Sequence, residues 1–511
     1  MSYKTFAAIY VGSSELAMKI FEINGKTNFK QIDYVSRILE LGKDTYNDGC
    51  ISTVSIHLIC DILNDFKDKM KEYQVTDYRA YATSAVREAD NSEIILDAIR
   101  RNTKIEVKIL SNSEQRYINF KGLVAKYDEF HQVVSKNTAF VDVGAGSVQV
   151  SLFDKNNLVV TENIPIGAVR IRDYLSTLGN KSGKLDLVIS EFVENDIFTF
   201  RNIYLNDKEI KNIIAVGEVI KAFKKLLPEL ENTDRIGKEM FDQVYNLVIK
   251  LTPQELNERY GIPYERATLM LPNVMIYKSF LNNCKAEDIY APNVDFCEGI
   301  VASYIDEGSK VVFNHNFDED IVASAYSISK RYKCNQKHIE TVSKYALKIF
   351  DSVKKIHGMG KKERLQLEIA AILHDCGNFI NMHDVANNSY YIIANTEIIG
   401  LSHKERMEIA NITRYNMLPM PPKATLSSDL GPCDYITIAK LTAILRIANI
   451  LDKSHMQKID DMTISIKDDK MLINVISYDD ISLEAGLFES RADFFEDVYG
   501  VRPIVRLRRN L

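Results

Sequence analysis

Two segments of the chain alternate apolar and polar residues on both sides of a short glycine turn. They are Phe6–Ile23 (FAAIYVGSSELAMKIFEI) and Phe140–Phe153 (FVDVGAGSVQVSLF). Alternation with a period of two predicts β-strands, and a small-residue turn between such strands predicts a hairpin. Because the same unit occurs twice, about 130 residues apart, the sequence predicts a duplicated architecture of two similar α/β lobes that face each other.

Helical spacing of apolar residues fills other parts of the chain. It covers residues 56–73 and 91–102 between the hairpins, and it dominates 318–454, where RLQLEIAAILHD and YITIAKLTAILRIANILD are examples. The last stretch, MTISIKDDKMLINVISYDD followed by SRADFFEDVYG, alternates like a hairpin with a two-aspartate turn and then reads as a helix.

These patterns divide the chain into four expected domains. We expect a first lobe at 1–128, a second lobe at 129–305, an all-helical domain at 306–455 and a small α+β domain at 456–511.

Composition narrows the class of protein. The 511 residues are 46% hydrophobic and 26% charged, with few glycines and prolines and no apolar run of 18 residues, which excludes fibrous, disordered and membrane-spanning proteins. The net charge of −6 gives no basic excess for nucleic acid. The seven cysteines show no CxxC spacing, and the first residues lack an export signal. We therefore expect a soluble, cytoplasmic protein with reduced thiols and neither a membrane nor a nucleic-acid partner.

The two glycine turns are the first candidates for chemistry. Their backbone N–H groups and hydroxyls suit phosphate oxygens. The residues concerned are Gly12, Ser13, Ser14, Gly144, Ala145, Gly146 and Ser147. Asp142, just before the second turn, is suited to hold a divalent cation against that phosphate. A single Gly-Ser turn is more often only a turn, but two in the same order indicate a phosphate cleft.

Two further segments join a strand end to a helix. In Ala82–Arg87 the arginine could reach a phosphate bidentately, although a surface arginine on a first helical turn is the simpler interpretation. In Ile109–Gln115 we expect Ser111 or Asn112 to cap a helix, and a carboxylate on its first turn could align water for attack on phosphorus.

In order and spacing, these blocks resemble the exopolyphosphatase / guanosine pentaphosphate phosphohydrolase (Ppx/GppA) enzymes nearly end to end. The blocks ATSAVRE, ENIPIGAVRIRDYL, LTPQELNERYGIPYERA and FCEGIVASY add to the match. The resemblance implies two lobes of the acetate kinase, Hsp70 and actin fold. It also implies release of orthophosphate from polyphosphate or pppGpp, assisted by a divalent cation that we expect to be magnesium, and a homodimer.

The site residues depart from the family pattern. Where the first family loop resembles D-x-G-S-N-S, this chain has Tyr10 in place of the acid. Gln115 stands at the position of the family's catalytic glutamate, and Gln149 at the glutamate that ends the second loop. Glutamine cannot accept a proton from water. The adjacent Glu114 is a substitute only by default, because on a helix it points about 100° away.

A fourth constellation lies in the helical part. His338, the pair His374-Asp375, and Asp452 come from three helical segments, and an adjacent His-Asp pair is typical of the HD phosphohydrolase superfamily. The resemblance extends to the HD-like domain of long family members, so a second divalent metal is expected here. The alternative is that these side chains are relics that fill a core, since the family's histidine-rich segment is Val385–Ser389 in this chain.

Three hypotheses remain open from the sequence. The first is a magnesium-dependent exopolyphosphatase-type hydrolase with impaired turnover. The second is a sensor that holds polyphosphate or a guanosine polyphosphate without cleaving it. The third is an HD-type nucleotide phosphohydrolase that uses the histidine site.

Overall fold

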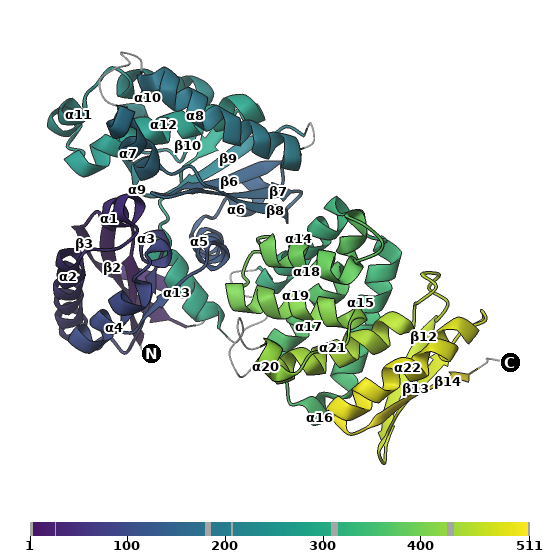
Figure 1. Cartoon of the computed structure of the whole chain (residues 1–511). Coiled ribbons are helices and arrows are strands. Elements are labelled where there is room, and N and C mark those ends of the chain that lie inside the picture. Colours follow the sequence, from purple (N-terminus) through teal and green to yellow (C-terminus); the bar gives the residue numbers. More distant parts are fainter. Residues whose placement is uncertain are drawn as a thin grey trace. The chain divides into compact units, whose positions relative to one another are not determined.

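The computed structural model describes residues 4–25, 27–178, 185–205, 208–307, 315–426 and 434–508. The chain divides into two compact units, residues 1–317 and 318–511, which are described in turn (Figure 1). The first unit contains two mixed sheets, and the second contains a helical array and a small sheet.

The first lobe is built on a five-stranded sheet in the order β3-β2-β1-β4-β5. Its strands are β1 (Lys4–Val11), β2 (Glu15–Asn24), β3 (Asn28–Ile38), β4 (Asp77–Ala82) and β5 (Val107–Ile109). Its helices are α1 (Leu41–Asp48), α2 (Thr53–Glu72), α3 (Ser84–Glu88), α4 (Ser92–Thr103) and α5 (Asn112–Lys126).

Strand β1 is apolar on both faces because helices cover both faces of the sheet. Ala7, Ile9 and Val11 pack in one core with α2 and α4. Phe6 and Ala8 point the other way, into a core with Ile118 of α5 and with α13 (Phe296–Asp306). This burial on both sides is why FAAIYV shows an apolar run within its alternation.

The second lobe is built on a six-stranded sheet in the order β10-β11-β9-β6-β7-β8. Its strands are β6 (Thr138–Val143), β7 (Val148–Asp154), β8 (Asn157–Ile164), β9 (Asn212–Val216), β10 (Arg235–Gly237) and β11 (Asp288–Tyr290). The remaining helices of this lobe are α6 (Phe130–Val134), α7 (Ala168–Leu178), α8 (Leu185–Phe200), α9 (Glu218–Lys224), α10 (Lys238–Val248), α11 (Pro253–Tyr260) and α12 (Tyr264–Cys284). Helices α8, α10 and α12 cover one face of the sheet (Figure 1).

The two lobes repeat one topology. In the first, β1, β2 and β3 form an antiparallel meander, and β4 and β5 add to β1 in parallel. In the second, β6, β7 and β8 form the same meander, and β9 and β11 add to β6 in parallel. Both predicted hairpins and the predicted duplication are therefore confirmed.

Helices α5 and α13 cross at two glycines. A methyl group on Gly122 of α5 would lie 2.7 Å from the backbone nitrogen of Gly299, and one on Gly299 would overlap the carbonyl oxygen of Ile118. The backbones of the two helices therefore touch directly, with no side chain between them.

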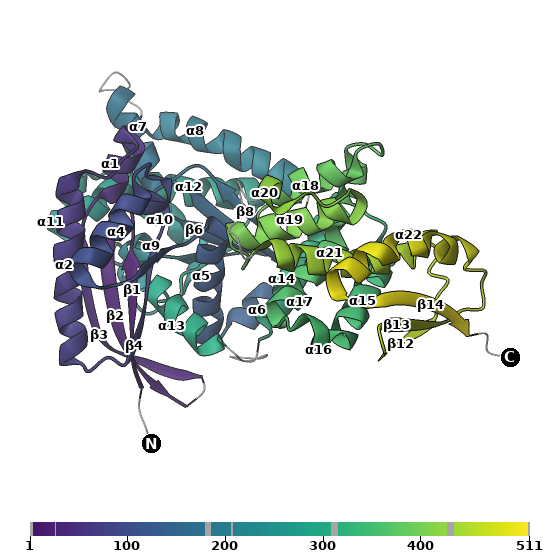
Figure 2. The ribbon, with the colours of Figure 1, turned by 60° about the horizontal axis from the view of Figure 1, so that its bottom comes forward.

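The second unit begins with helices that pack on one another (Figure 2). They are α14 (Phe317–Arg331), α15 (Gln336–Ser352), α16 (Lys354–His357), α17 (Lys361–Leu373), α18 (Val385–Asn395), α19 (His403–Met417), α20 (Lys423–Leu426) and α21 (Asp434–Ile450). A three-stranded sheet follows, made of β12 (Asp461–Lys467), β13 (Lys470–Ile476) and β14 (Arg502–Arg508), with α22 (Ser482–Tyr499) as the crossover between β13 and β14. The predicted hairpin with its turn at Asp468 and Asp469 is confirmed.

None of the helices in the described part of the chain combines the length and the apolar character needed to cross a membrane. The six cysteines in the described part are free thiols, and Cys433 lies outside it.

Candidate functional site

A cavity of about 160 Å³ lies between the two lobes of the first unit. Ser13, Ser14, Gly144 and Ala145, from the turns of the two hairpins, line it, together with the ends of strands β1 and β6. The structure thus brings the two predicted loops to one cavity, although they are separated by 130 residues in the sequence.

Both loops use the same turn. The N–H of Gly12 donates to the carbonyl of Glu15 at 2.9 Å, and the N–H of Gly144 donates to the carbonyl of Ser147 at 2.9 Å. These two glycine amides are therefore occupied and do not bind a ligand. The amides of the next residues donate to no acceptor within the described residues: Ser13, Ser14, Ala145 and Gly146. Ser13, Ser14 and Ala145 line the cavity, so both turns provide amide donors of the kind that phosphate oxygens need.

Tyr46 of α1 lies between the loops. Its hydroxyl is 3.3 Å from the Ser13 hydroxyl, and it occupies the space that a methyl group on Gly146 would fill. The guanidinium of Arg170 lies 4.6 Å from the centre of its ring. Sequence reasoning missed Tyr46, because no local pattern marks a residue that two distant turns approach.

Tyr10 covers the first loop. Its ring is 2.5 Å from the position of a methyl group on Gly12, so the glycine is required for the ring to lie there. The ring also packs against Phe296, with 5.1 Å between centroids. Burial raises the pKa of the phenol well above its usual value, so it remains neutral. The position expected to carry an acid thus carries a neutral, buried hydroxyl.

Asp142, at the end of β6, is the acidic residue of the second loop. One of its oxygens accepts a hydrogen bond from Asn119 of α5 at 2.6 Å. Burial raises the pKa of Asp142 to about 6, although Arg116 and Asn119 oppose the shift. Gln149 lies directly opposite on β7, and its Oε1 has no hydrogen-bond partner among the described residues.

Gln115 and Glu114 begin the same helix but have different surroundings. Gln115 lines the cavity, and its buried Oε1 has no hydrogen-bond partner in the described part of the chain. Glu114 turns back to the helix start, where it accepts from the backbone N–H and hydroxyl of Ser111 at 3.0 Å and pairs with Lys108 at 2.7 Å. Ser111 is the N-cap, as one of the two alternatives predicted. The neutral side chain, and not the carboxylate, faces the cavity.

Arg87 does not line the cavity. Its guanidinium donates to the Leu110 carbonyl at 2.7 Å and to the Asn112 side chain at 2.5 Å, and so it braces the start of α5. The proposed phosphate clamp would require this arginine to leave both partners.

A buried cluster of charges closes another wall. Lys19 of β2 lies 2.6 Å from Asp295, the N-cap of α13, and 2.7 Å from Glu298 on the same helix. Although burial opposes it, the nearby ammonium group of Lys19 keeps the pKa of Asp295 well below its usual value, whereas burial and the neighbouring carboxylate raise the pKa of Glu298. Asp295 lines the cavity, but both carboxylates are engaged by the lysine.

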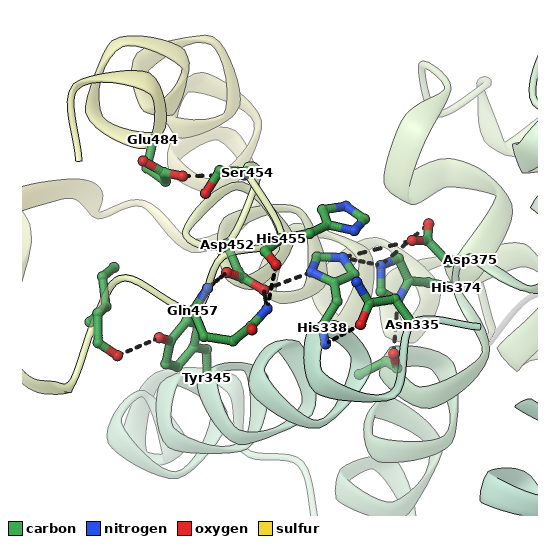
Figure 3. A network of polar contacts seen from close by, with 12 residues as sticks. Asn335, His338, Tyr345, His374, Asp375, Asp452, Ser454, His455, Gln457 and Glu484 are labelled. Carbon is green, nitrogen blue, oxygen red and sulfur yellow. Dashed lines mark hydrogen bonds and ion pairs between the residues drawn. The ribbon is translucent and has the colours of Figure 1, made fainter. Parts of the chain in front are cut away.

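The second unit contains the histidine site (Figure 3). His338 Nδ1 lies 2.8 Å from Asp452 Oδ2, and its Nε2 lies 3.2 Å from His374 Nε2. Asp375 is 3.8 Å from His338 Nε2 and 3.6 Å from His374 Nε2. The four residues singled out in the sequence therefore meet, from the starts or ends of α15, α17 and α21.

His455 is a fifth member that the sequence did not predict. Its ring stacks on His338 with 3.6 Å between centroids and an angle of 6°. One ligand atom each from His338, Asp375 and His455 lies within 4.8 Å of the other two. In the sequence, the one signal that could have identified His455 is its position three residues after Asp452.

Two protein-family models match this chain. The model described as Ppx/GppA phosphatase family matches residues 20–307, and the one described as Ppx/GppA phosphatase, domain III, matches residues 322–490. The chain belongs to the Ppx/GppA phosphatase family.

Relatives of this Ppx/GppA protein differ in how much they share with it. A guanosine-5'-triphosphate,3'-diphosphate pyrophosphatase of Aeromonas hydrophila is 18% identical over 459 residues, which cover 87% of each chain. A bifunctional 3-dehydroquinate synthase/phosphatase of Fusobacterium nucleatum is 21% identical over 292 residues, which cover 54% of this chain and 43% of that protein.

Solved structures support the fold. An exopolyphosphatase from Cytophaga hutchinsonii superposes with a TM-score of 0.54 at 16% identity, and the match covers 60% of this chain and 99% of that one. The two-lobed α/β fold that the resemblance implied is therefore confirmed.

Proposed function

We propose that the cavity between the lobes holds the terminal phosphates of a linear phosphoanhydride, either inorganic polyphosphate or a guanosine polyphosphate, and hydrolyses it slowly. The proposal rests mainly on one observation: on the first turn of α5, Gln115 lines the cavity, whereas Glu114 caps its own helix.

Binding and hydrolysis place different demands on the site. The unbonded amides of Ser13, Ser14, Ala145 and Gly146 suit phosphate oxygens. Hydrolysis needs a group that takes a proton from the attacking water, and loss of such a base lowers rates by about 10²–10⁴. Gln115 can orient a water through Oε1 but cannot take its proton. The site therefore keeps its anion donors and lacks its base.

A magnesium ion fits the side chains at this cavity. The donor set is Asp142 and Gln115, which line the cavity, and Gln149, which lies opposite Asp142 on β7. The Oε1 atoms of both glutamines have no partner among the described residues. Magnesium prefers oxygen ligands and often takes only one or two carboxylates besides substrate phosphates. When bound, the ion would neutralise phosphate charge; the residues of the chain would then orient the anion and a water.

The decisive experiment measures orthophosphate release from long-chain polyphosphate with magnesium. We expect slow release by the parent protein and a rise of about 10²-fold or more for Gln115→Glu, because the variant restores a proton acceptor at the cavity. The matched control is Gln132→Glu, which adds the same charge at an exposed position of α6 and leaves the rate unchanged.

Binding is measured in parallel by calorimetry with the same polyphosphate. We expect the parent to bind and Ser14→Asp to bind at least tenfold more weakly, because a carboxylate at the loop repels the anion. Fast turnover by the parent would contradict impaired hydrolysis, and absence of polyphosphate binding would contradict the whole proposal.

A second candidate function, an HD-type metal-dependent phosphohydrolase, is favoured by the two imidazoles of the second unit. His374 Nδ1 donates to the Ala371 carbonyl at 2.7 Å, and burial lowers the pKa of His374, so its Nε2 carries a lone pair. His338 Nδ1 donates to Asp452, so its Nε2 faces that lone pair at 3.2 Å. The gap between the two Nε2 atoms needs a positive charge, either a proton or a metal ion.

We propose that a divalent metal takes this position, with His338, His374, Asp375 and His455 as ligands. Three imidazoles and one carboxylate suit a borderline metal such as Zn²⁺. Asp452, expected from the sequence as a ligand, instead holds the His338 ring, which is the usual arrangement behind a metal-bound histidine.

The test is elemental analysis of the purified protein. We expect about one equivalent of transition metal in the parent, loss of metal in His374→Ala and His455→Ala, and an affinity about 10–100-fold lower in Asp452→Asn. The exposed His383→Ala is the matched control and keeps its metal. Equal metal content in all variants would show that the histidines only fill a core.

A further inference from the structure

The second unit contains another cavity, of about 260 Å³, that no function discussed so far uses. It lies where the ends of α19 and α21 meet the middle of α22. Three cationic side chains line it, Arg446, Lys453 and Arg491, and none of its described lining residues is acidic. This concentration of one sign of charge stands out in a chain with a net charge of −6.

Arg446 is the most buried of the three, with 7% of its surface exposed. Its Nε donates to the Tyr415 carbonyl at 2.8 Å and its Nη2 to the Leu418 carbonyl at 2.5 Å, and its guanidinium lies 4.2 Å from the ring centre of Phe494. The two carbonyl oxygens accept hydrogen bonds from Arg446, but they do not neutralise its positive charge. Burial and the neighbouring Arg491 lower the pKa of Arg446 to about 10, a sign that the two cations repel each other.

No ion pair with a carboxylate is formed by Arg446, Lys453 or Arg491 in the part of the chain that the structure describes. Buried and half-buried guanidinium groups normally have an acidic partner in the fold. Among the described residues, therefore, none supplies a negative charge that would balance these cations.

Asn416 provides an independent observation. It is 2% exposed, it lines the cavity, and neither its Oδ1 nor its Nδ2 has a hydrogen-bond partner among the described residues. Buried amides are almost always hydrogen-bonded, since an unpaired donor costs about 1–3 kcal/mol. An unpaired amide beside three cations indicates a missing polar ligand.

We propose that this cavity binds a small phosphate-bearing anion, whose oxygens accept from Asn416 Nδ2 and from the guanidinium and ammonium groups of Arg446, Arg491 and Lys453. The cavity volume is just below the range of typical small-molecule pockets, which suits a pyrophosphoryl group better than a whole nucleotide. The proposal stands apart from the function of the cleft in the first unit.

Asn449 connects this cavity with the histidine site. It lines the cavity, and its side chain lies within hydrogen-bonding reach of His374. An anion in the cavity would thus lie one residue away from the proposed metal ligands.

The test is hydrogen–deuterium exchange of the full chain, with inorganic pyrophosphate as the probe and sodium chloride at equal ionic strength as the blank. At ten times the Kd, we expect exchange in the segments 446–453 and 487–491 to slow by about tenfold. Peptides covering residues 10–17 and 142–149 report the cleft of the first unit separately, so failure of one site is distinguishable from failure of the other.

Variants identify the groups responsible. We expect Arg491→Gln and Lys453→Gln each to raise the Kd for pyrophosphate at this cavity by about tenfold. The control Lys467→Gln removes an exposed charge on β12 and leaves that Kd unchanged. Asn416→Leu should weaken binding without lowering the midpoint of thermal unfolding, which separates loss of a ligand contact from loss of the fold.

Two outcomes would overturn the proposal. One is unchanged exchange in 446–453 and 487–491 at saturating pyrophosphate. The other is protection there that persists in both Arg491→Gln and Lys453→Gln.

Discussion

Among the individual residues, Gln115 owes its place at the cavity to the cap of its helix. The capping pattern of Ser111 and Glu114 fixes where α5 begins, and that start places Gln115 toward the cavity. Tyr46 and His455 were not predicted. Tyr46 matters because two distant loops approach it, and His455 reaches His338 from a backbone with a φ of 57°, which nothing in its neighbours announces.

Asp142 leads to a prediction about pH. Because its folded pKa is about 6, above the ordinary value, the ionised carboxylate destabilises the folded protein at neutral pH. We expect Asp142→Asn to raise the free energy of unfolding by about 3 kcal/mol at pH 7.5. The gain should shrink as the pH falls below 6 and vanish below about pH 3, where Asp142 is protonated in both the folded and the unfolded state. Urea unfolding at a series of pH values measures this.

The control for this prediction is Asp61→Asn on the exposed side of α2, which should change stability little at any pH. If Asp142→Asn is less stable than the parent at pH 7.5, the carboxylate stabilises the loop. That result would contradict the prediction that the ionised carboxylate destabilises the folded protein.

At the scale of the element, alternation and helical spacing predicted the hairpins, α2, α4 and the helical array. Strand β3 was missed because its residues are largely exposed and show no apolar face, and β14 was missed because arginines interrupt it. The crossing of α5 and α13 was missed as well. A single Gly122 or Gly299 in a helix carries no signal until the partner helix is known.

The crossing yields a prediction with a matched control. We expect Gly299→Ala to lower the free energy of unfolding by about 2–3 kcal/mol, because the new methyl group meets backbone atoms that cannot move aside. Gly486→Ala, on α22, meets nothing within 4 Å and should raise stability by about 0.5–1 kcal/mol through helix propensity. Chemical denaturation measures the free energy of unfolding of both variants. Equal changes in the two variants would mean that α5 and α13 can move apart without loss of stability.

At the scale of the whole molecule, the net charge of −6 excluded a strongly basic protein but concealed where charges are missing. Acidic groups are absent or engaged around the cleft of the first unit, and cations gather around the cavity near Asn416. The net charge adds the two regions together, so neither the shortage of free acidic groups at the cleft nor the cluster of cations at the cavity could be predicted from it. The division into units, each with its own core, follows from long-range packing.

Two compact units should unfold in two calorimetric transitions. If the histidine site holds a metal, a chelator should lower the midpoint of one transition by about 5 °C and leave the other unchanged, because only one unit contains the site. His374→Ala should show the lowered midpoint without chelator and no further response to it. A chelator that moves both transitions, or neither, would contradict a resident metal in this unit alone.

The contact between Gly122 and Gly299 is also the point about which α5 and α13 would rotate relative to each other. Gln115 lies seven residues before Gly122 on α5, which places it about 10 Å along the helix axis from the crossing. A turn of about 10° between the two helices would carry Gln115 by about 2 Å, the difference between a formed and a broken hydrogen bond. With α13 packed on the first sheet, small changes in the angle between these helices are therefore magnified at the side chain that faces the phosphate cleft.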